Sequence, residues 1–87
     1  MISLEFTYRS KTYYALIRTK LNEQRLAYYV TIMNGELERM LYGNHILIDE
    51  AGKLRSDPEI LDQEIAELKQ CVTDALTERL QLYGLVN

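Results

Sequence analysis

The spacing of the apolar residues changes once along this chain, and that change limits the folds open to it. From Ile2 to Tyr8 apolar and polar residues alternate, a period of two that is typical of a strand with one buried face. In the second half the apolar residues recur at steps of three and four, the period of an amphipathic helix: Leu61, Ile65, Leu68, Val72, Leu76, Leu80 and Tyr83. A strand-rich first half followed by one long helix predicts a two-layer α+β fold.

Turn signals divide the first part of the chain into five expected strands, over residues 2–8, 11–20, 25–33, 36–42 and 45–49. Arg9-Ser10 fits a short turn between the first two strands. Asn34-Gly35 is the strongest local signal, because this pair tolerates positive φ at both central positions of a type I′ hairpin turn. We therefore predict an antiparallel four- to five-stranded meander.

The helix is expected over residues 58–83, with Ser56 or Asp57 as its cap and Pro58 in its first turn. A chain of 87 residues is too short for two cores, so we expect a single domain over residues 1–87. In this two-layer arrangement the one long C-terminal helix is packed on one face of the sheet.

A single helix covers only one face of the sheet, and the other face is predicted to be rich in tyrosine and methionine. Pairing residues outward from the two turns assigns the aliphatic side chains to the helix side. The candidate interface on the opposite face comprises Tyr14, Leu16, Arg18, Tyr29, Met33, Met40 and Tyr42. Because Tyr and Met are enriched at protein interfaces, we expect a homodimer or another protein partner there. The alternative is that large tyrosines only line an open sheet, as their strand propensity allows.

Arg39 and His45 are candidates for contact with an anion or a small ligand. The predicted register places Arg39 on the aliphatic face opposite Val30, where a charge is costly unless it is paired. Three alternatives are open for Arg39. Its side chain extends past the helix at the sheet edge, it pairs with an acidic residue of the helix, or a bulge breaks the predicted register and places it elsewhere. His45 follows a strand break at Gly43-Asn44, and the alternative for it is a partly exposed imidazole at a loop edge.

No combination of residues predicts catalysis. The chain has one histidine and one cysteine, and neither is spaced with other ligands as a metal site requires. The four glycines are scattered and form no phosphate-binding loop. We therefore predict that the protein is not an enzyme and that it has no catalytic, cofactor-binding or metal-binding residues.

Charge is divided unevenly along the chain. Residues 1–33 carry five basic and two acidic side chains, whereas residues 34–87 carry five basic and eleven acidic ones. The net charge of −3 argues against nucleic acid as the main partner. The basic and acidic halves indicate internal or head-to-tail complementarity as readily as an external ligand.

These features together predict a small cytoplasmic protein-interaction module. One unpaired cysteine fits a reducing compartment, and no apolar run approaches the roughly 20 residues that cross a bilayer, so we expect no membrane contact. The module is expected to associate with itself through the tyrosine- and methionine-rich face. The alternative is small-ligand or single-stranded nucleic-acid binding on the same face.

Overall fold

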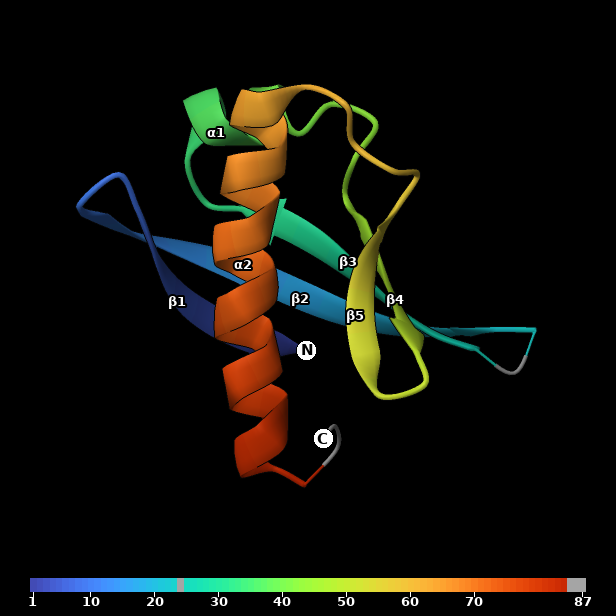
Figure 1. Cartoon of the computed structure of the whole chain (residues 1–87). Helices are drawn as coiled ribbons and strands as arrows, with labels where there is room; N and C mark the ends of the chain where they lie inside the picture. The colour runs from blue at the N-terminus through green and yellow to red at the C-terminus, as the bar shows by residue number, and fades with distance from the viewer. Residues whose placement is uncertain (24, 85–87) are drawn as a thin grey trace.

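The α+β class and the antiparallel meander are confirmed. The computed structural model describes residues 1–23 and 25–84, and in this part five strands form one sheet in the order β1-β2-β3-β4-β5 (Figure 1). The strands are β1 Ile2–Tyr8, β2 Lys11–Asn22, β3 Arg25–Ile32, β4 Ile46–Glu50 and β5 Lys53–Asp57. The helices are α1 Gly35–Met40 and α2 Gln63–Leu82.

Helix α2 lies along one face of the sheet and contacts both edge strands, β1 and β5. Figure 1 shows why one helix reaches both edges: strands β1 to β3 cross behind α2, whereas β4 and β5 turn steeply and run beside it. The sheet therefore curls around the helix, in keeping with the twist of antiparallel strands.

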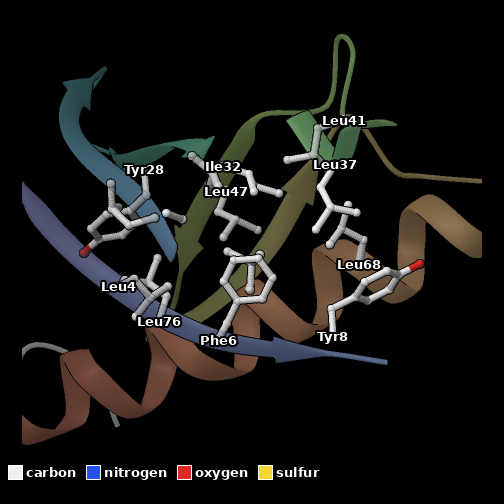
Figure 2. Close-up of a cluster of buried hydrophobic side chains, with 14 of the residues drawn as sticks. Leu4, Phe6, Tyr8, Tyr28, Ile32, Leu37, Leu41, Leu47, Leu68 and Leu76 are labelled. Carbon is white, nitrogen blue, oxygen red and sulfur yellow. The ribbon is translucent and has the colours of Figure 1, made fainter. Parts of the chain in front are cut away.

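The core lies between α2 and the sheet face that it covers (Figure 2). Alternate residues of β1, β2 and β3 enter it, as the sequence pattern predicts, together with one stripe of α2. Its buried side chains include Leu4, Phe6, Ala15, Ile17, Val30, Ile32, Leu68, Val72, Leu76 and Leu80. Leu61 and Tyr83, which the helical period also predicts on the stripe, are 90% and 57% exposed because both lie outside α2.

The β1–β2 hairpin has the predicted turn and register. Tyr8 pairs with Lys11, so Arg9 and Ser10 are the two central turn residues. Both have positive φ, 50° and 67°, as type I′ geometry requires. Arg9 also donates from Nε to the Glu67 carboxylate of α2 at 2.8 Å, which ties the turn to the helix.

Residues 36–42 do not form the strand that the sequence pattern predicted. Gly35–Met40 form α1, and Asn34, expected in a hairpin turn, is its N-cap, whose side chain accepts a hydrogen bond from the Leu37 amide. Glu38 reaches back and accepts a hydrogen bond from the Ile32 amide at 2.9 Å. The Asn-Gly pair fits a turn and a helix start equally well, and the high helix propensity of Glu-Leu-Glu-Arg-Met favours the helix.

The long helix begins later than residue 58. Lys53–Asp57 form β5, which pairs with β4 across a two-residue turn. Asp62, rather than the expected Ser56 or Asp57, therefore caps α2, and its side chain accepts a hydrogen bond from the Ile65 amide at 3.1 Å. The strand that follows β3 in the sheet is β4, which replaces the predicted strand over residues 36–42.

Candidate functional site

The sheet face opposite α2, here called the open face, carries the side chains that alternate with the core residues. Neighbouring strands place Arg18 beside Tyr29, and Ala27 beside Ile48, on this face. Its side chains fall into three zones along the strands: an apolar patch, a stacked row and a groove with a basic rim.

Tyr14, Leu16 and Met33 form the apolar patch at one end of the open face. Tyr14 is 54% exposed and Met33 is 61% exposed, while Leu16 is half-buried. The Met33 amide donates to the Tyr14 carbonyl at 2.8 Å, which holds the residue after β3 beside β2. These three residues are the apolar part of the predicted interface that the structure brings together.

Met40 and Tyr42 do not lie on the open face, because the hairpin register that placed them there was wrong. Met40 ends α1 and packs half-buried against the core. Tyr42 lies in the turn after α1 and is 87% exposed. The predicted interface is thereby reduced to Tyr14, Leu16, Arg18, Tyr29 and Met33.

The predicted place of Arg39 on the aliphatic face is wrong for the same reason. It is an exposed residue in the last turn of α1, so the register fails at a helix rather than at a bulge. Within residues 1–23 and 25–84 its guanidinium forms no ion pair. A positive charge in the last helical turn is favourable in itself, which accounts for Arg39 without a ligand.

The stacked row crosses the middle of the open face and consists of Arg18, Tyr29 and His45. The Arg18 guanidinium carbon lies 5.0 Å from the centre of the Tyr29 ring, within the range of a cation–π contact. The His45 ring stacks on Tyr29 with 5.3 Å between centroids and 10° between planes. Tyr29 is therefore engaged from both sides, by β2 and by the residue before β4.

His45 is more enclosed than a loop-edge imidazole, since its side chain is 13% exposed. Its Nε2 lies 2.8 Å from Oε2 of Glu38, in ion-pair range. Within the described residues, Nε2 makes no hydrogen bond of normal geometry. Glu38 thus links α1 to the sheet twice, through His45 and through the Ile32 amide.

Lys69 of α2 fixes the backbone on either side of His45. Its side chain is almost fully buried, and its Nζ donates to the carbonyls of Asn44 and Ile46. The His45 carbonyl between them accepts from the Val30 amide at 2.8 Å. Three successive carbonyls, those of Asn44, His45 and Ile46, are therefore bound where β4 begins, which holds the imidazole against Tyr29.

Sequence reasoning missed this role of Lys69, although a signal was present. Lys69 lies four residues after Ile65 and three before Val72, so the helical period places it on the buried stripe. A lysine on an apolar stripe needs polar atoms for its ammonium group. Those atoms are the carbonyls of Asn44 and Ile46 at the start of β4, which only the tertiary fold brings near.

The third zone is a groove of about 610 Å³ where the β2–β3 hairpin passes β4, and we call it the basic groove. The apolar residues that line it include Ala27, Ile46 and Ile48. Lys20 and Arg25 line it as cations. The sequence pattern gave no indication of this groove, because it arises where the sheet curls between β3 and β4.

A charge network borders the basic groove on β4 and β5. Glu50 accepts hydrogen bonds from Arg25 at 3.3 Å and from Arg55. The Arg55 hydrogen bond, reinforced by the charges of Arg55 and Arg25, holds the pKa of the Glu50 carboxyl below its ordinary value. Two guanidinium groups, those of Arg25 and Arg55, thus share the Glu50 carboxylate.

Comparison of the chain with protein-family models, curated proteins and solved structures found no match. In the described part of the chain, no group of three or more His, Cys, Asp or Glu residues is placed to hold a metal ion. Across the same residues no helix combines the length and the apolar character needed to cross a membrane.

Proposed function

We propose that the protein is a small protein-interaction module that associates with itself through the open face. The observation that carries this proposal is the apolar patch, in which Tyr14 and Met33 are each more than half exposed beside Leu16. The patch lies on the sheet face that α2 leaves uncovered. Tyrosine and methionine are residue types that interfaces favour, and exposed apolar groups that meet in one place favour burial against a partner.

A second copy of the chain is the partner that we propose. An isologous contact sets the same patch against itself, so it needs no further surface and closes at the dimer. On the open face Glu5 is the cross-strand neighbour of Tyr14, and Arg18 follows Leu16 along β2. These two residues would supply a polar rim of both charges. The stacked row would give this interface a rigid border, because Tyr29 is already held by two neighbours.

Amide chemical shifts followed over a concentration range test this proposal. Self-association through the patch predicts concentration-dependent shifts for residues 14–18 and 31–33, and none for the turn at residues 51–52. A spectrum that stays unchanged from about 10 μM to about 1 mM would contradict it, because an interface of ordinary size associates within that range.

A second candidate is single-stranded nucleic-acid binding on the same face, and the exposed Arg18 and Lys20 of β2 support it because their charges attract phosphate. The carboxylate of Glu38 lies against His45 of the stacked row and counts against phosphate binding there. Because Tyr29 is engaged, Tyr14 would be the residue on which a base stacks.

Titration with a fluorescent oligothymidylate separates the second candidate from the first. It predicts binding that weakens steeply with salt and weakens again in Tyr14→Ala. Absence of binding at low salt would contradict it and would leave self-association untouched.

A further inference from the structure

We propose that the basic groove binds a small organic carboxylate with an apolar body. This site lies at the opposite end of the open face from the apolar patch, so it stands independently of self-association. Its volume of about 610 Å³ falls within the range of about 300–1,000 Å³ that is usual for small-molecule sites.

The floor of the groove suits an apolar body. Ile46 is 37% exposed there and Ala27 is half-buried, so apolar surface remains open to water at the centre of the groove. Ile48 is only 9% exposed, and its cross-strand neighbour is Arg55 of the charge network. A ligand on this floor would remove apolar surface from water on both partners.

The rim of the groove suits a carboxylate. Lys20 is exposed and has no ion-pair partner within residues 1–23 and 25–84. Arg25 contacts Glu50 through Nη2 alone, which leaves other N–H groups of its guanidinium to donate to a second carboxylate. Among the lining residues that the structure describes, the acidic one is Glu23, which stands at the hairpin turn.

The two cations come from neighbouring strands and stand at one end of the apolar floor. Lys20 pairs with Ala27 across β2 and β3, and Arg25 is two residues from Ala27 along β3. A ligand that carries its charge at one end and its apolar part at the other matches this order. A neutral ligand of the same length would still contact the apolar floor but would make no ion pair with Lys20 or Arg25.

Octanoate and 1-octanol are the probes for this site, since they share a chain length and differ in charge. Titration of 15N-labelled protein with octanoate is expected to saturate, with a dissociation constant below about 1 mM and amide shifts confined to residues 20–29 and 46–48. Octanol is expected to bind at least about fivefold more weakly, because it offers no charge to Lys20 and Arg25.

Lys20→Glu and Lys11→Glu form a matched pair of charge reversals on β2. Lys11 is exposed and lies at the far end of the strand from the groove. Octanoate binding is expected to weaken about fivefold or more in Lys20→Glu and less than about twofold in Lys11→Glu, because exposed charges act over about 10 Å. Neither change should alter self-association.

Ile46→Gln tests the floor separately and is expected to weaken octanoate and octanol alike. The proposal is overturned if octanol binds as tightly as octanoate, if the two lysine variants behave alike, or if octanoate does not saturate. Shifts that map to the apolar patch instead of the groove would overturn it as well.

Discussion

Two single side chains near the start of β4, Lys69 and Glu38, each make several contacts. Lys69 joins α2 to the backbone before β4, and Glu38 joins α1 to His45 and to β3. Removing an ammonium group from water is costly, and here carbonyl groups offset part of that cost. The buried lysine therefore stabilises the fold only while its hydrogen bonds to the Asn44 and Ile46 carbonyls are formed.

Lys69→Met tests this dependence. Methionine fills a similar volume but offers no donor, so the part-buried hydrogen bonds to the Asn44 and Ile46 carbonyls are lost. We expect the free energy of unfolding to fall by about 1–3 kcal/mol, measured by urea denaturation. The exposed Lys11→Met is the control and should change stability by less than about 0.5 kcal/mol. A Lys69→Met variant as stable as the wild type would show that the carbonyls do not need the lysine.

Two buried tyrosines make the protein sensitive to alkali. Burial, as the largest cause, raises the pKa of the Tyr8 and Tyr28 phenols, and the nearby charge of Asp49 adds to it at Tyr28. An unfolded tyrosine titrates near about 10, so above that pH the native state holds more protons than the unfolded state. The contribution of these two tyrosines to stability is therefore constant below this pH and falls as pH rises through it.

Urea midpoints at about pH 8 and about pH 10.5 measure the effect. The wild type is expected to lose stability between them, and Tyr8→Phe with Tyr28→Phe should lose less. An equal loss in wild type and double variant would assign the alkaline sensitivity to other groups.

At the scale of elements, residues 34–40 are the segment whose sequence fits two structures, a helix start and a hairpin turn. A hairpin needs positive φ at Gly35, whereas α1 needs helical φ there, and Gly35 is absent from the positive-φ residues. Gly35→Ala is therefore expected to stabilise the protein by about 0.5 kcal/mol, since alanine is the better helix former. An ideal Cβ at Gly35 meets nothing nearer than an Arg39 guanidinium atom at 3.9 Å.

Asn34→Ala is the counterpart and should lower the free energy of unfolding by about 0.5–2 kcal/mol through loss of the cap. Thermal or urea unfolding of both variants decides the matter. Destabilisation by Gly35→Ala would favour the hairpin and contradict α1.

In the β4–β5 turn, alanine occupies a position with positive φ, which asparagine and glycine adopt more readily. Ala51 has a φ of 56° and Gly52 one of 82°. Ala51→Asn creates the Asn-Gly pair that type I′ turns prefer, and should raise stability by about 0.5–1 kcal/mol. Ala51→Val should lower it, because a branched side chain resists positive φ. Equal unfolding midpoints in the two variants would contradict this turn geometry.

The same comparison of elements shows what the sequence could predict. The alternation in β1 and the two-residue turn at Arg9-Ser10 are local, so strand, register and face followed from them. In residues 36–42 a period of two and a helical period coincide over one short segment, because Leu37 and Leu41 fit both. β5 has Leu54 as its one apolar residue and is a strand because β4 pairs with it, which no local pattern records.

The candidate site divides in the same way. Tyr14, Leu16, Arg18 and Tyr29 lie on the open face as predicted, because strand alternation decides the face. The predicted places of Met40 and Tyr42 on the open face were wrong because the predicted hairpin does not form. The basic groove and the contacts of Lys69 depend on the curl of the sheet, which the spacing of residues along the chain does not predict.

At the scale of the whole molecule, the exposed surface of α2 is more acidic than the open face. The open face carries Arg18, Lys20 and Arg25 together with Glu5 and Glu50, whereas the exposed positions of α2 and its cap include Asp62, Glu64, Glu67, Asp74 and Glu78. A head-to-tail contact between these surfaces would add further copies without closing, and would weaken with salt. A contact through the apolar patch closes at two copies and depends little on salt.

Sedimentation equilibrium of the wild type, Tyr14→Lys and Tyr42→Lys tests the proposed interface most directly. The two variants make the same chemical change at two exposed tyrosines, one on the open face and one in the turn after α1. The account predicts a wild-type mass that rises to twice the monomer and stops there, a folded monomer for Tyr14→Lys, and wild-type behaviour for Tyr42→Lys. A wild type that remains a monomer at about 100 μM, or a Tyr14→Lys variant that associates as the wild type does, would contradict it.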